Sequence, residues 1–182
     1  MSQEEGYTST AKGLHWISGI IWIVAWVIGF VAVHWRDELN PAHFLTLLHK
    51  AMASTLIFLV ILRLAWRVTH PAPGMPETMS RPMQQAASVG HWLLYGVALI
   101  GLPVSGWYWS SVADKPIMVA GLYQLPPLVE PEEGMYATAK AIHTYVGWFC
   151  GLLVVGHVAA ALKHHFVDKD AVLKGMLPGG NH

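Results

Sequence analysis

The sequence predicts an all-α integral membrane protein, a bundle of four transmembrane helices with both termini in the cytoplasm. Hydrophobic residues make up 54% of the 182 residues and charged residues only 12%, about half the charged share of soluble domains. Four segments are long and apolar enough to cross about 30 Å of hydrocarbon. Basic residues are also more numerous on one side of these segments than on the other. We expect residues 1–182 to form a single membrane-embedded domain.

The first predicted span, Leu14–Trp35, contains no charged residue. Glu4 and Glu5 precede it, and no small-residue cleavage site follows it. We therefore expect a retained helix rather than a signal peptide.

The second predicted span, Phe44–Val68, follows a short connection that contains Pro41. Lys50 and Arg63 leave only twelve uncharged residues between them. A buried helix of a soluble protein is the alternative for this segment. We favour a membrane span, because both cations lie near its ends, where they can reach the interface or a partner.

The third and fourth predicted spans, Val89–Val112 and Ala141–Phe166, are almost free of charge. The proline-rich segment Thr69–Ser88 is expected to be an irregular cytoplasmic connection. The outer loop Ala113–Lys140 is long and acidic, and its apolar stretch Ile117–Leu128 is expected to lie in the interface as a short helix.

Seven basic residues fall on the side of the two termini and four on the opposite side. The first group is Lys12, Arg63, Arg67, Arg81, Lys163, Lys169 and Lys174; the second is Arg36, Lys50, Lys115 and Lys140. This imbalance predicts cytoplasmic termini. The formal net charge is zero, so nothing indicates a nucleic-acid partner, and membrane lipid is the expected surrounding.

Histidines inside the apolar spans are the main candidate functional residues. His143 and His157 are fourteen residues apart, which puts both imidazoles on nearly one helix face, about 21 Å apart in depth. His15 falls at the depth of His157, and His49 at the depth of His143. An intramembrane histidine usually bonds a neighbouring helix or binds a ligand, and four at two matched depths favour ligation.

Haem accounts for two histidines per depth better than zinc does. No cysteine or carboxylate lies at these depths to complete a tetrahedral zinc shell. Haem supplies four ring nitrogens and needs only two axial protein ligands. We therefore expect one iron between His15 and His157, near the cytoplasmic face, and one between His49 and His143, near the outer face.

Small residues along the third and fourth spans could admit a flat porphyrin face. They are Gly96, Gly101, Gly106, Gly147, Cys150 and Gly151. Helix packing through small residues explains them equally well. Cys150, the single cysteine, excludes an internal disulfide and is expected to be an apolar filler on the ligand face.

Two further histidines are candidates at the cytoplasmic end. His91 opens the third span and rivals His15 as an axial ligand. His164 follows His157 by seven residues on the same face, where it suits a quinone carbonyl or a haem propionate.

Basic residues near the predicted ligands have two interpretations. Arg63 and Arg67 follow His49 by fourteen and eighteen residues and match haem propionates or a quinone headgroup. Lys50 adjoins His49, and Lys140 lies one turn before the next ligand histidine, so both could steer a small anion to a haem edge. Simple anchoring at the interface is the alternative for all four.

Short motifs recur in order along the chain: Gly13–Trp16, Leu48–His49, Gly90–His91, Lys140–His143, Gly156–His157 and His164–Phe166. With these motifs the whole chain resembles the bacterial cytochrome b561 family of small di-haem membrane proteins. The resemblance implies two b-type haems on the same histidine pairs. It also implies electron transfer with ubiquinone at the cytoplasmic side of a bacterial inner membrane.

Three functions are compatible with these features. The first is a superoxide:ubiquinone oxidoreductase, as in a superoxide oxidase that the chain resembles, with Lys50, Lys140 and His164 taking part. The second is an electron conduit or b-type subunit that serves a partner dehydrogenase or a soluble redox protein through its acidic outer loop. The third is a non-redox membrane protein whose histidines only form hydrogen bonds.

Overall fold

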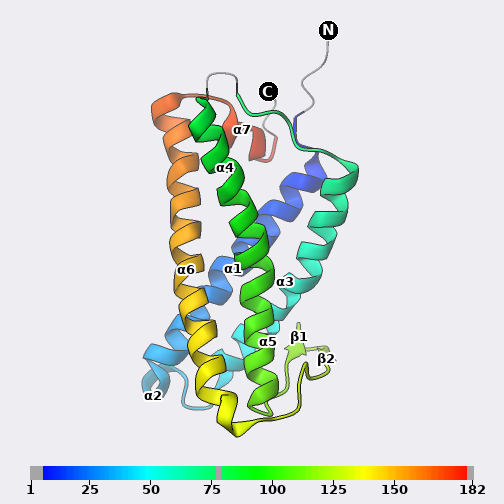
Figure 1. Ribbon diagram of the computed structural model, residues 1–182, viewed down its shortest axis with the longest axis vertical. Helices are drawn as coiled ribbons and strands as arrows, with labels where there is room; N and C mark the ends of the chain where they lie inside the picture. Colours follow the sequence, from blue (N-terminus) through cyan, green and yellow to red (C-terminus); the bar gives the residue numbers. More distant parts are fainter. Residues whose placement is uncertain (1–5, 77–78, 180–182) are drawn as a thin grey trace.

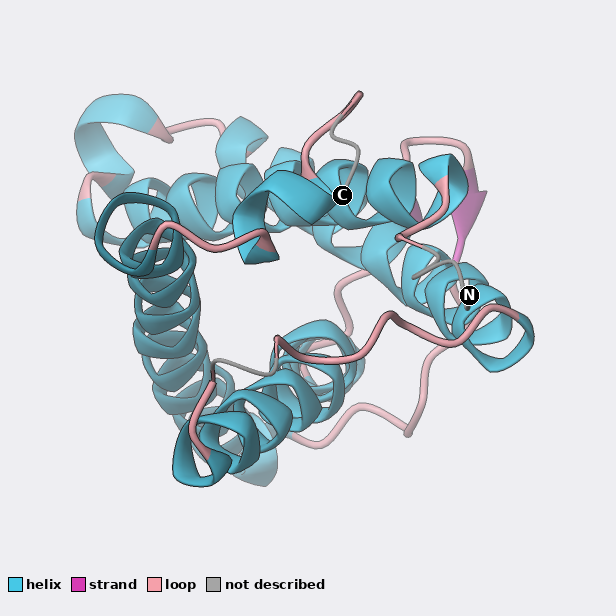
Figure 2. Cartoon of the chain, turned by 90° about the horizontal axis from the view of Figure 1, so that it is seen from above, coloured by secondary structure: helices cyan, strands magenta, loops and turns pink. Residues whose placement is uncertain are grey.

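The computed structural model describes residues 6–76 and 79–179. Four helical spans, Ser9–His34, Phe44–Thr69, Arg81–Val112 and Glu133–Asp168, run along one another (Figure 1) and surround a common centre (Figure 2). The predicted four-helix membrane bundle is therefore confirmed. The sidedness of the bundle stays a prediction, and Glu4 and Glu5 lie outside the described residues.

The two ends of the bundle differ in what they carry. The start of α1 (Ser9–His34) and the last helix, α7 (Val172–Met176), lie at one end, which we call the terminal end (Figure 1). The opposite, distal end carries the short helix α2 (Arg36–Leu39) and a small hairpin. The indole of Trp16 donates to the Met176 carbonyl over 2.8 Å, which ties α7 to α1.

The first span begins five residues earlier than predicted. The Thr8 hydroxyl accepts from the Ala11 amide over 3.2 Å, which satisfies one of the free donors of the first turn. The connection to α3 (Phe44–Thr69) is fixed by Asn40, which is 2% exposed. The Asn40 amide donates to the Ala32 carbonyl, and its oxygen accepts from the Leu45 amide.

The third span starts at Arg81, so the prediction that residues up to Ser88 form an irregular loop is wrong. Pro82 lies in the first turn of α4 (Arg81–Leu93). A proline in the first turn costs the helix nothing, since the amides there have no helical acceptor. The span continues through the π-helical segment η1 (Leu94–Gly101) into α5 (Leu102–Val112).

Pro103 accounts for the wide turns of η1. Because proline has no N–H and its ring collides with the carbonyl four residues before it, a regular α-helix cannot continue through it. The Leu102 amide bonds the Val97 carbonyl, five residues back. The Ala98 carbonyl, which that amide would otherwise reach, accepts instead from the indole of Trp22 over 3.0 Å.

The distal loop is a hairpin, so the predicted interfacial helix at Ile117–Leu128 is wrong. β1 (Met118–Val119) pairs antiparallel with β2 (Tyr123–Gln124). Ala120 and Gly121 both have positive φ, which suits a tight hairpin turn. The Ala120 amide donates to the Ala51 carbonyl, so the hairpin lies against α3 close to His49.

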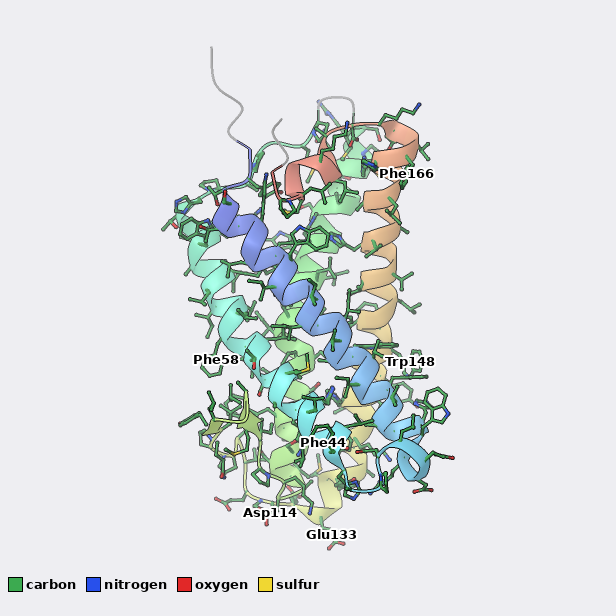
Figure 3. All side chains as sticks on the ribbon, turned by 180° about the vertical axis from the view of Figure 1, so that it is seen from behind. Phe44, Phe58, Asp114, Glu133, Trp148 and Phe166 are labelled. Carbon is green, nitrogen blue, oxygen red and sulfur yellow. The ribbon has the colours of Figure 1, made fainter. Side chains whose placement is uncertain are left out.

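The fourth span also begins earlier than predicted. A 3-10 turn, η2 (Glu133–Met135), leads into α6 (Tyr136–Lys163), and the π-helical turn η3 (His164–Asp168) follows. Side chains on the outside of the bundle are apolar: Phe58, Trp148 and Phe166 point away from it (Figure 3). Such an outer face fits lipid contact.

The core lies between the two ends. Its buried members are Trp22, Leu56, Val60, Ala98, Leu99, Leu102 and Cys150. Cys150 is fully buried, which confirms that it is an apolar filler inside the bundle.

Candidate functional site

The distal end brings His49 of α3 against His143 of α6, with ring centroids 6.2 Å apart. The Nδ1–H of His49 donates to the Ala25 carbonyl of α1 over 2.8 Å. Because a carbonyl only accepts, Nε2 of the neutral ring keeps its lone pair. Gly29 makes room for this ring, since a Cβ at that position would lie 2.7 Å from Nδ1 of His49.

His143 is held in the same way from the third span. Its Nδ1 lies 3.0 Å from the hydroxyl of Ser105, and that hydroxyl donates to the Leu102 carbonyl over 2.8 Å. The Ser105 oxygen therefore accepts from Nδ1–H, which leaves Nε2 of His143 with a free lone pair. A Cβ at Gly106 would lie 2.9 Å from the His143 ring, so glycine is needed here too.

The spacing of the distal pair fits two axial ligands on one iron. An iron–nitrogen bond of about 2.0 Å and a ring radius of about 1.1 Å put two coaxial imidazoles about 6.2 Å apart, centre to centre. A metal-bound histidine usually donates a hydrogen bond from the N–H of its second ring nitrogen to a neighbouring acceptor, and Nδ1–H of His49 and of His143 makes such a bond. The residues present therefore fit a bis-histidine haem.

The terminal end brings His15 of α1 against His157 of α6, also with ring centroids 6.2 Å apart. Arg63 donates toward Nδ1 of His15 over 3.4 Å. Since guanidinium cannot accept, this contact puts the proton of the neutral ring on Nε2. Ligation of iron through Nε2 therefore requires the opposite tautomer of His15 and a turn of the Arg63 guanidinium away from Nδ1.

His91 is also close to this pair, as the sequence predicts for a rival ligand. Its ring centroid lies 5.5 Å from that of His157, at an interplanar angle of 80°. Its Nδ1–H donates to the Ala87 carbonyl, so its Nε2 is free as well. The spacing expected for two axial ligands matches His15 with His157 better than His91 with His157.

Arg63 points into the bundle. It donates to the Ser18 hydroxyl over 2.7 Å and to the Tyr95 hydroxyl over 3.2 Å, and it lies over the Tyr95 ring. Among the described residues no carboxylate lies within ion-pair distance of it. Arg67, in contrast, is exposed and makes no hydrogen bond or ion pair within the described part of the chain, so it does not share the position predicted for it beside Arg63.

His164 is nearly buried and has carboxylate partners. Its Nδ1 lies 2.6 Å from Asp170 and 3.3 Å from Asp168. Three ligand atoms of this group lie close enough to hold a metal ion. However, the Lys163 ammonium already pairs with Asp168 over 2.6 Å.

Of the three lysines at the distal end, Lys50 and Lys115 are neighbours, whereas Lys140 stands apart from them. The Lys50 ammonium donates to the Lys115 carbonyl over 3.4 Å, so these two lysines are neighbours. Lys140 is exposed on α6, and no contact of its ammonium is found within residues 6–76 and 79–179.

Sequence reasoning missed several residues around the histidines: Ser18, Gly29, Tyr95, Ser105 and Trp109. One signal could have found Gly29, which follows His15 by fourteen residues, the same spacing that relates His143 to His157. Ser105 and Tyr95 had no comparable signal, because the π-helical segment η1, which contains Tyr95 and precedes Ser105, changes which faces of the third span point inward.

Comparison with known proteins shows which family the chain belongs to. The profile of the prokaryotic cytochrome b561 family matches residues 6–179. Cytochrome b561 homolog 2 of Escherichia coli K12 is 34% identical over 173 residues, which cover 95% of this chain and 92% of that protein. The probable superoxide oxidase CybB of Yersinia pestis is 26% identical, with 94% and 96% covered. Since the family profile spans nearly the whole described chain, this four-helix membrane protein with a histidine pair at each end belongs to the prokaryotic cytochrome b561 family.

Proposed function

We propose that this membrane-bound b-type cytochrome oxidises superoxide at the distal end and reduces ubiquinone at the terminal end of the bundle. His49 with His143, and His15 with His157, are the proposed axial ligands of two haems. The proposal is carried by one observation: both pairs have a ring separation of 6.2 Å, and they lie at opposite ends of the bundle. The proposed location is a bacterial inner membrane, with the terminal end in the cytoplasm.

The reaction must combine one-electron and two-electron chemistry. Each superoxide gives up one electron and leaves as O2, whereas ubiquinone takes two electrons and two protons to become ubiquinol, so two superoxide anions are consumed per ubiquinone. Two haems, when bound, supply the one-electron couples that connect the two ends. The protein must therefore admit an anion at one end and supply protons at the other.

At the distal end, lysines support the choice of an anionic donor. Lys50 follows His49 directly and reaches the backbone of Lys115, and Lys140 is exposed one turn before His143. Positive charges near an opening raise the local concentration of a small anion. A relative of this chain is named a probable superoxide oxidase, which supports the same substrate.

At the terminal end, Arg63 and His164 are the residues we propose for the acceptor side. Arg63 is a cation with hydroxyl partners and no carboxylate partner among the described residues, so it suits an oxygen of a quinone or of a haem propionate. Nδ1 of His164 donates to Asp170, which leaves Nε2 of the neutral ring with a free lone pair. Nε2 can therefore take up a proton and then pass it to a quinone oxygen. Arg67 remains a weaker candidate for the same role, because it is exposed.

The deciding experiment is stopped-flow addition of superoxide to the purified oxidised protein, with and without ubiquinone. Superoxide should reduce both haems, and ubiquinone should reoxidise them with ubiquinol formed at half the amount of superoxide consumed. Absence of haem reduction by superoxide would contradict the proposed donor. Reduction without reoxidation by ubiquinone would contradict the proposed acceptor.

A second function, an electron conduit for a partner protein, is favoured by the acidic residues of the distal end. A cavity of about 620 Å³ is lined by Asp114, Glu133 and Tyr136, among others. Asp114 and Glu133 gather at that end (Figure 3). Carboxylates around an opening suit a basic redox protein or dehydrogenase rather than an anion. In that case the purified protein should need the partner for turnover and should fail to react with superoxide.

A further inference from the structure

One buried donor of the distal end has no partner. The indole Nε1–H of Trp109 is buried and makes no hydrogen bond within the described part of the chain. Five other indoles each donate to a protein oxygen: Trp16 to Met176, Trp22 to Ala98, Trp26 to Gly147, Trp66 to Thr8 and Trp107 to Pro126. The other indoles that make no hydrogen bond within the described residues, those of Trp35, Trp92 and Trp148, belong to exposed side chains, so Trp109 differs from them in that its N–H is buried.

An unsatisfied buried donor of this kind loses its hydrogen bonds to water without replacement, so native proteins rarely leave one without an acceptor. Trp109 lies on α5 with its ring centroid 5.8 Å from that of His143 and 6.0 Å from that of Tyr136. The missing acceptor must therefore belong to a group that lies beside the distal histidine pair.

The chemistry of the position narrows the choice of acceptor. The indole N–H has almost no contact with solvent, so a substrate that arrives and leaves would satisfy it only briefly. A permanently bound group with acceptor oxygens satisfies it throughout. A haem ligated by His143 carries two propionate carboxylates at its edge, and a carboxylate is a stronger acceptor than a neutral oxygen.

We propose that the Nε1–H of Trp109 donates a hydrogen bond to a propionate of the haem held by His49 and His143. This inference rests on the proposed function, because it requires haem at the distal pair. The bond would draw negative charge away from the haem edge and so favour the reduced form. Trp109 is thus a cofactor-binding residue that raises the reduction potential of the distal haem.

The test compares Trp109→Phe with Trp107→Phe in the full-length haem-loaded protein. Trp107 is a matched control on the same helix, because its indole already donates to the Pro126 carbonyl over 2.9 Å. Three quantities are measured: haem content, the two midpoint potentials, and the propionate bending band in resonance Raman spectra. We expect Trp109→Phe to lower the reduction equilibrium constant of the distal haem about threefold, or about 30 mV for a one-electron couple. The propionate band should shift as well, and Trp107→Phe should leave both unchanged.

A second variant covers the case in which Trp109→Phe does not fold. Placing 3-benzothienylalanine at position 109 keeps the double ring and replaces only the N–H with sulfur, and it should give the same shifts. Two haems with unchanged potentials and an unchanged propionate band in that variant would overturn the inference, as an ordered water or a backbone oxygen would then be the acceptor. A wild-type protein with haem at the terminal pair alone would overturn the proposed function and this inference together.

Discussion

The second ring nitrogen of each proposed ligand histidine distinguishes the two ends of the bundle. At the distal pair, Nδ1 of His49 and of His143 donates to a fixed acceptor, so both rings present Nε2 in the form that binds metal. At the terminal pair, Nδ1 of His15 faces the donor Arg63. For the two haems that we propose, the distal pair thus already has the tautomers of an axial ligand pair, whereas the terminal pair would have to rearrange to bind.

Ligand substitutions should separate the two haems. His143→Ala should remove the distal haem and His157→Ala the terminal one, because each iron then loses one of two axial bonds. Haem content and reduced absorbance bands give the readout. His91→Ala should keep both haems. Loss of a haem in His91→Ala together with full retention in His15→Ala would show that His91 is the true ligand of the terminal site.

Glycine substitutions should affect only the positions that meet a histidine ring. Gly29→Ala puts a methyl group 2.7 Å from His49, so we expect a loss or displacement of the distal haem, measured as lower haem content and an altered midpoint potential. Gly19→Ala is the control on the same helix, because its Cβ meets nothing within 4 Å. Equal behaviour of the two variants would contradict a role of Gly29 in seating His49.

The carboxylate behind His164 should matter for proton delivery. Asp170→Asn weakens the bond that holds His164 Nδ1 over 2.6 Å, so ubiquinone reduction should slow and its dependence on pH should change, while both haem spectra persist. Lys174→Gln is the control at the same end of the bundle, since that side chain on α7 is exposed. Unchanged ubiquinone kinetics in Asp170→Asn would exclude this pair from the acceptor site.

At the scale of elements, periodicity explains what could be predicted. The fourteen-residue spacing of His143 and His157 fixes their helix face and depth, so their positions could be predicted from one helix alone. Partners on other helices could not, because the Ala25 carbonyl and the Ser105 hydroxyl reach the histidines only after packing. Pro82 was misassigned to a loop because proline suits both a loop and the first turn of a helix.

The π-helical segment of the third span also depends on a neighbouring helix. Trp22→Phe removes the donor to the Ala98 carbonyl and leaves that carbonyl buried without a partner, so we expect a loss of about 1–3 kcal/mol of stability. Thermal unfolding in detergent measures it. Trp92→Phe is the control, because Trp92 lies on the same span and is 74% exposed. A smaller loss in Trp22→Phe than in Trp92→Phe would contradict this account of the segment.

At the scale of the whole molecule, charge is arranged along the axis of the bundle. The terminal end holds the inward cation Arg63, whereas the distal end carries the neighbouring lysines Lys50 and Lys115 and a cavity lined by the carboxylates Asp114 and Glu133. The sign of the field at the distal end therefore decides between a small anion and a basic protein as the electron donor.

Salt dependence tests that sign. If lysines steer superoxide, haem reduction should slow as salt is added, since screening limits the field to about 8 Å near physiological ionic strength.

Neutralising Lys50 and Lys140 with Gln should slow reduction by superoxide and leave reduction by a neutral quinol unchanged. The matched control neutralises Lys169 and Lys174, which makes the same change of charge at the terminal end. A native rate and native salt dependence in the Lys50 and Lys140 double variant would rule out steering by these lysines. If salt instead accelerates the reaction, the carboxylates of Asp114 and Glu133 dominate the field, and a basic partner protein becomes the better donor.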